Sequence, residues 1–138
     1  MSYFTGAPLQ EAIFAALSNN AALNALVSGR IYDAPPEALD AAETPYVIIG
    51  DERVRDWSSN THTGARHDIV ISVQSDAAGF ATAKSAAGAV SQALDGADLA
   101  LSAGQLVVMQ FVAARAARAL SPASRRIDLT FRALVQTS

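Results

Sequence analysis

Residues 29–57 read GRIYDAPPEALDAAETPYVIIGDERVRDW, and this stretch decides how the chain is organised. Gly29 predicts a turn, which leads into the apolar and aromatic pair Ile31-Tyr32. Three prolines and many small residues forbid a regular element over 33–45, so we expect a loop there. A strand is expected to follow over 46–54. The stretch holds no arrangement of side chains that could perform chemistry, so its importance is architectural.

Two helices are expected before this stretch. The first should end near Ser18, because its apolar residues recur at helical spacing. That stripe consists of Leu9, Ile13, Ala16 and Leu17. A shorter helix is expected over 21–27, ended by Gly29.

After the stretch, the polar and turn-rich residues 55–65 predict a long hairpin loop. Residues 66–75 then alternate between two faces, which is typical of a half-buried strand. The apolar face of that strand holds Ile69, Ile71 and Val73, and the other holds Asp68, Val70, Ser72 and Gln74.

The clearest pattern of the chain predicts a helix over 79–94. Its apolar stripe consists of Phe80, Ala83, Ala87, Val90 and Leu94. We then expect a short apolar segment over 99–101, a long strand over 105–118 and a last strand over 125–136. The long strand should place four residues on one face: Val107, Met109, Phe111 and Ala113.

This order of elements predicts an α+β fold, with a mostly antiparallel sheet of about four to five strands and helices packed on one face. The 138 residues should form one domain, 1–138. With 51% hydrophobic and 17% charged residues the composition is that of a globular protein. No apolar run is long enough to span a bilayer, so we expect no membrane partner. Cysteine is absent, which excludes disulfides and thiolate chemistry and fits a reducing cytoplasm.

Charge is distributed unevenly along the chain. Residues 1–98 hold twelve acidic and five basic residues, a net charge of −7, and residues 99–138 hold five arginines and one aspartate, a net charge of +4. Such polarity can steer self-complementary assembly, or it can reflect two ordinarily solvated faces. The overall charge of −3 argues against general nucleic-acid binding.

The search for catalytic chemistry finds little. His62 and His67 lie five residues apart across a loop and a strand, and zinc sites need more ligands at tighter spacing, so we expect two solvated histidines and no metal. Asp51 and Glu52 are neighbours on a strand and should face opposite ways, so they cannot act as a carboxylate pair. We therefore predict no catalytic residue and no cofactor, and a protein that is not an enzyme.

The only tryptophan, Trp57, is a candidate interface residue. It stands beside Arg53, Arg55 and Asp56, and aromatic residues next to arginines are typical interface anchors. Alternatively, Trp57 folds back to cap the edge of its own core.

In order and spacing, several segments resemble the tail-completion or tail-terminator proteins of long-tailed phages and of phage-derived gene transfer agents. The resemblance covers nearly the whole chain. It rests on the first helix, Gly29–Asp33, Pro35-Pro36, Pro45–Asp51, Arg55–Ser58, His67–Ser75, the alanine-rich helix and Leu129–Ala133. The motifs are individually weak, and it is their shared order that identifies the family.

The resemblance implies a structural virion protein that forms a hexameric ring on the head-proximal end of a tail tube, after assembly in the host cytoplasm. Such a ring halts tube growth and presents a docking surface for head–tail connector or stopper proteins. Double-stranded DNA passes through its channel without being read. On this hypothesis Trp57 and its loop contact the tail tube protein or an adjacent subunit, and Arg115 and Arg118 pair with Asp51 or Glu52 of the next subunit. The alternatives are another neck ring protein, for head completion or as a stopper, and a small-molecule-binding α+β module.

Overall fold

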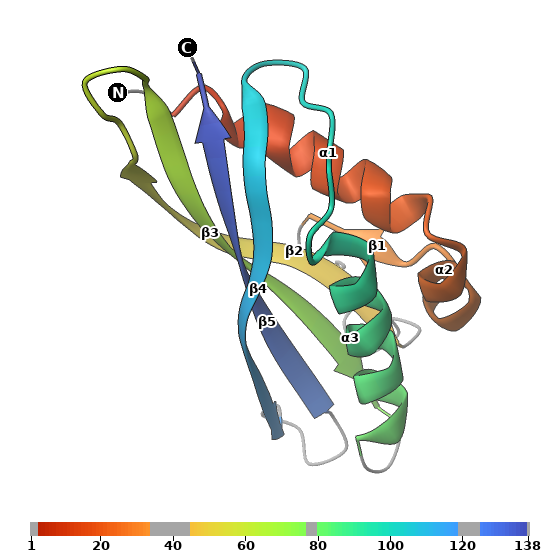
Figure 1. Cartoon of the computed structure of the whole chain (residues 1–138). Coiled ribbons are helices and arrows are strands. Elements are labelled where there is room, and N and C mark those ends of the chain that lie inside the picture. The colour runs from red at the N-terminus through yellow and green to blue at the C-terminus, as the bar shows by residue number, and fades with distance from the viewer. Residues whose placement is uncertain (1–2, 34–44, 77–79, 119–124, 138) are drawn as a thin grey trace.

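The computed structural model describes residues 3–33, 45–76, 80–118 and 125–137, and it confirms the α+β fold. Within these ranges three helices accompany one five-stranded sheet of order β1-β2-β3-β5-β4. The elements are α1 (Gly6–Ser18), α2 (Ala21–Val27), β1 (Ile31–Tyr32), β2 (Tyr46–Asp56), β3 (Gly64–Ser75), α3 (Ala81–Leu94), β4 (Gln105–Arg118) and β5 (Arg125–Gln136). β1 pairs with β2 in parallel and the other neighbours are antiparallel. Figure 1 shows the three helices gathered on one side of the twisted sheet.

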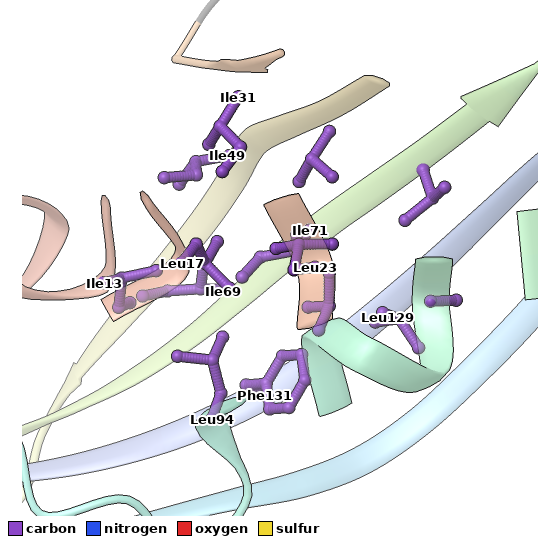
Figure 2. Close-up of a cluster of buried hydrophobic side chains, with 14 of the residues drawn as sticks. Ile13, Leu17, Leu23, Ile31, Ile49, Ile69, Ile71, Leu94, Leu129 and Phe131 are labelled. Atoms are coloured by element: carbon purple, nitrogen blue, oxygen red, sulfur yellow. The ribbon is translucent and has the colours of Figure 1, made fainter. Parts of the chain in front are cut away.

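The core lies between the helices and the sheet, and β5 contributes to it along its whole length. Every second residue of β5 from Ile127 to Val135 is buried, and the residues between them are half-buried, as the alternation predicts. Phe131 is the largest fully buried side chain and lies among Leu94, Ile69 and Leu129 (Figure 2). Each large apolar side chain buried in this way contributes about 1.5–3 kcal/mol.

The helices bury the stripes that their spacing predicts. Leu9, Ile13 and Leu17 of α1 are fully buried, and α3 buries Ala83, Ala86 and Ala87 together with Val90 and Leu94. α2 begins at Asn20, whose side chain accepts a hydrogen bond from the Leu23 backbone N–H at 2.9 Å. It ends in the left-handed conformation, which Ser28 already adopts one residue before the predicted Gly29.

Three boundaries differ from the predictions. The hairpin between β2 and β3 is tighter, because strand pairing continues to Asp56↔Ala65, and only 57–63 form the loop. Arg55 and Arg66 on these strand ends lie on the side of the sheet away from the helices, so polarity does not mark a loop there. β1 is a short strand, whereas 99–101 is not a strand, although Leu99 and Leu101 pack against the core. The predicted loop over 33–45 falls mostly outside the described residues.

The predicted apolar face of β4 is wrong, because the strand contains two irregularities, one between Leu106 and Val108 and one between Phe111 and Ala113. Each inserts one residue and reverses the alternation that follows. Leu106 and Met109 are consequently buried, while Val107 is 47% exposed. Met109 and Phe111 do share a face, opposite Ala133 and Phe131.

Candidate interaction surface

The side of the sheet away from the helices is rich in arginine. Strand alternation opposite the buried residues places these basic side chains there: Arg53, Arg55, Arg66, Arg115, Arg126 and Arg132. Asp68 and Asp128 lie among them. We call this the bare face. Its excess of basic residues contrasts with the net charge of −3 of the whole chain.

Part of this charge is balanced within the chain. Asp68 accepts hydrogen bonds from Arg132 Nε at 2.9 Å and from Arg66 Nη2 at 3.0 Å. Burial raises the pKa of Asp68, but the hydrogen bonds and positive charges of these two arginines outweigh it and hold the pKa below its usual value. Asp128 similarly accepts hydrogen bonds from Arg126 at 2.7 Å and from the Ser72 hydroxyl at 2.6 Å.

The arginines that the sequence analysis named as interface candidates take no part in these ion pairs. Arg53, Arg55, Arg115 and Arg118 are exposed, and none of them forms an ion pair with another described residue. The structure does not bring them together. Arg53 and Arg55 lie on β2, and Arg115 and Arg118 lie on β4, toward the opposite edge of the sheet.

Trp57 lies at the tip of the hairpin, half-buried against its own loop. Its ring meets the His62 ring edge-on with centroids 4.9 Å apart, and its backbone N–H donates to Gly64. At Gly64 a Cβ atom would come within 2.8 Å of backbone oxygens of Trp57 and Val135, so only glycine fits. The tip is thus held in shape, with exposed Asp56 and Ser58 joined by a hydrogen bond beside it.

The acidic pair separates as predicted, and its two carboxylates have different surroundings. Asp51 is exposed at the irregularity of β2, whereas Glu52 points to the helix side. There one carboxylate oxygen lies 2.9 Å from His67 Nδ1 and the other accepts a hydrogen bond from the Tyr3 hydroxyl. Partial burial raises the pKa of Glu52, but the hydrogen bonds from His67 and Tyr3 outweigh it, so the net pKa is lowered. The same hydrogen bond raises the pKa of Tyr3.

The expectation of a solvated His67 is also wrong. His67 and Thr5 are both fully buried, and His67 Nε2 lies 2.9 Å from Thr5 Oγ1. Hydroxyl, imidazole and carboxylate therefore follow one another as in a nucleophilic triad. A substrate cannot reach a hydroxyl that is fully buried, so we read this cluster as a polar tie between the residues preceding α1 and the sheet. His67 continues the buried alternation of Ile69, Ile71 and Val73, and that register could have predicted its burial.

An open groove of about 680 Å³ lies beside β1, where the sequence suggested no site. It is lined by three aromatic residues, Tyr3, Phe14 and Tyr32, and by the acidic residues Glu11 and Asp33, among others. These residues come from separate segments, so no local motif marks the groove.

Among the described residues, no group of three or more histidine, aspartate or glutamate side chains could hold a metal ion. In the same part of the chain, no helix is both long and apolar enough to cross a membrane.

Comparison with known proteins identifies close relatives. The family model described as tail completion protein gp17 matches residues 11–136. Among solved structures, a chain from the virion of a native gene transfer agent particle is 52% identical to this one. The match covers 98% of this chain and 99% of that chain, with a TM-score of 0.89. None of the curated proteins matches.

Proposed function

Because the chain belongs to the family of tail completion proteins, we propose that it caps the head-proximal end of a phage-like tail tube as a ring. The coarser role needs no proposal: this is a structural protein of the virion tail. The observation that supports the finer role is the family match over 11–136, together with the close likeness to a chain of a gene transfer agent virion. On this proposal the ring stops tube polymerisation and docks head–tail connector proteins.

The proposed mechanism is a mismatch between two surfaces of the ring. A tube grows because each ring offers the next a matching surface, which is a heterologous contact that does not close. A terminator presents one side of that contact to the tube and a different surface on its other side. Growth then stops, and a connector protein can bind.

The hairpin tip is our candidate for the contact with the tube or with an adjacent subunit. The loop 57–63 projects past the helices at one end of the sheet (Figure 1). Trp57 offers a rigid aromatic surface there, with Arg53, Arg55 and Asp56 beside it. On this proposal the ring channel carries double-stranded DNA without reading its sequence. The channel should be acidic or neutral, because a strongly basic one would hold the phosphates through counterion release.

The first test is the mass of the purified protein by light scattering, alone and with assembled tail tubes. We expect a ring bound to tube ends and tubes that no longer lengthen. A protein that ignores tubes but binds portal-side neck proteins would contradict the terminator role and favour a head-completion or stopper ring.

Trp57→Ala tests the contact residue. We expect a folded protein whose tube binding falls at least about tenfold, the loss of one hot-spot residue. Trp57→Phe keeps an aromatic ring and serves as the matched control, for which we expect most of the binding to remain. Unfolding of Trp57→Ala, measured by circular dichroism, would show that Trp57 belongs to the core instead.

A further inference from the structure

Among the described residues, both outer edges of the sheet have backbone groups without a pairing strand, and these lie at diagonally opposite corners. On one side, β1 pairs only with Val47 and Ile48, so no described residue pairs with the outer edge of β2 over Glu52–Asp56. On the other side, β4 is the last strand, and its seven residues 112–118 lie beyond the part covered by the end of α3. We call these the β2 edge and the β4 edge.

The hydrogen-bond pattern shows which groups point outwards. Trp57 donates to Gly64, so the alternation of an antiparallel ladder turns the backbone groups of Glu52, Val54 and Asp56 away from β3. On β4, Met109 and Phe111 bond to the segment after α3, and the register with β5 turns the groups of Ala114, Ala116 and Arg118 outwards.

The β4 edge lacks most of the devices that protect exposed strands. Its sequence is VAARAAR, without proline or acidic residues and with small side chains that allow close approach. Phe111 and Val112, at its start, are 39% and 41% exposed. Such an edge is a template for another strand.

We propose that the β4 edge of one copy pairs with the β2 edge of the next copy, so that one sheet continues from subunit to subunit. This inference rests on the proposed ring and specifies the contact between neighbouring subunits, which we call the joint. β4 runs opposite to β2 within the sheet, so a second copy added beside β4 in the same orientation meets it as an antiparallel partner. The diagonal placement of the two edges staggers successive copies, and a sheet closes into a barrel only with such a stagger.

Charge selects this pairing over the twofold alternative. Joining two β4 edges would bring the Arg115 and Arg118 side chains of two copies together, and like charges opposite one another destabilise a sheet. Joining β4 to β2 places Arg118 beside acids instead, and Arg115 comes near one arginine, Arg55, at a diagonal position. The register that we favour sets Ala116 opposite Asp56 and Arg118 opposite Val54, between the carboxylates of Glu52 and Asp56. It also sets Arg115 opposite Trp57, an arrangement that allows a cation–π contact.

Cysteine cross-linking tests the joint on a background that has no native thiol. In the proposed register Ala116 and Asp56 form a hydrogen-bonded pair with Cα atoms about 5.5 Å apart, which suits a disulfide. Within one copy the two residues are three strand spacings apart, about 14 Å or more, so they cannot join. The double variant Ala116→Cys/Asp56→Cys, oxidised with and without tail tubes, should give a ladder of covalent multimers.

The single variants are the matched controls. Each alone should remain monomeric on a non-reducing gel, and an equal mixture of the two should give dimers and nothing larger. A dimer from Ala116→Cys alone would show β4 pairing with β4 and overturn the proposal. The double variant Ala116→Cys/Val54→Cys tests the register shifted by two residues. A stronger ladder of covalent multimers from this variant would support the same pairing of edges in that shifted register.

Light scattering separates failure of the joint from failure of the proposed function. A ring that forms without cross-links in either register would overturn the joint and leave the capping role intact. Cross-linked multimers that never bind tubes would support the joint and contradict capping. No ring, alone or on tubes, would contradict both.

A backbone test is independent of cysteine. Ala116→Pro removes an N–H that points away from β5, and proline is tolerated at such edge positions, so the fold should persist. We expect ring formation to weaken at least about tenfold, with Ala116→Ser, which keeps the N–H, behaving as the unchanged control. Normal assembly of a folded Ala116→Pro protein would overturn the joint.

Discussion

The two sides of the sheet are built from alternate residues of the same strands, yet they obey different rules. On the helix side of β5, side chains such as Leu129 and Phe131 are buried under helices of the same chain. The alternate residues of the same strand, such as Asp128 and Arg132, lie on the bare face. The partners of Asp128 and Arg132 are other charged or polar side chains. The helix side therefore explains why the chain folds, whereas the unpaired arginines of the bare face find no explanation within one chain. Each experiment below tests this division through stability, from the largest expected effect to the smallest.

Truncating Phe131 to alanine should give the largest loss, because it empties the centre of the helix side. We expect about 3–5 kcal/mol of lost stability, the usual cost of deleting a buried aromatic ring. Urea unfolding followed by circular dichroism measures it. A loss below about 1 kcal/mol would mean that the centre of the core lies elsewhere.

The tie between Thr5 and His67 is the polar exception on the helix side. Thr5→Val keeps the shape of the side chain but leaves His67 Nε2 buried without a partner, which should cost about 1–3 kcal/mol. Thr5→Ser keeps the hydroxyl and should cost less than Thr5→Val. A larger loss in Thr5→Ser than in Thr5→Val would show that the methyl group matters more than the hydrogen bond and would contradict the polar tie.

Asp68 tests how much the ion pairs of the bare face contribute. Its pKa is lowered in the folded protein, so its contribution to stability is present above the unfolded value of about 3.9 and is lost as the pH falls through the folded value. Asp68→Asn should cost on the order of 1 kcal/mol at pH 7, because the pair is partly exposed. The difference from the unmodified protein should shrink on acidification. A difference that stays constant down to pH 2 would contradict a role for the charge.

Arg115 should have the smallest effect on folding. It is exposed and makes no ion pair with another described residue, so Arg115→Ala should change stability by no more than about 0.5 kcal/mol. Thermal unfolding of the isolated protein measures this. A larger loss would mean that the bare face stabilises the chain on its own, and the division between the two faces would fail.

The sequence predicts the helix side well, because burial imposes periodicity on it. The stripes of α1 and α3 and the alternation of β3 and β5 are all visible as spacing. One extra residue in a strand exchanges the faces of all the residues that follow, without any change in composition. The predicted apolar face of β4 is wrong for that reason.

The candidate surfaces were predicted only in part. Trp57 and the arginines can be picked out by residue type. Whether each is available to bind another subunit depends on its partners inside the chain, and those partners come from distant strands. Glu52 illustrates this, since it is 15 residues from His67 and 49 residues from Tyr3. The open edges are a property of sheet order, which no local pattern encodes.

The place of β5 in the sheet also governs when the protein can assemble. It is the last strand in sequence but lies between β3 and β4, so β4 has no neighbour in the sheet until β5 has been synthesised. β4 and β5 are consecutive strands and pair locally, but the β3–β5 contacts that join them to the rest of the sheet span a long sequence separation. Such contacts form slowly, after the local helices and the β2–β3 hairpin. If β4 forms the joint between copies, a nascent chain cannot offer it in a folded form. The order of strands would thereby make ring assembly wait for finished subunits.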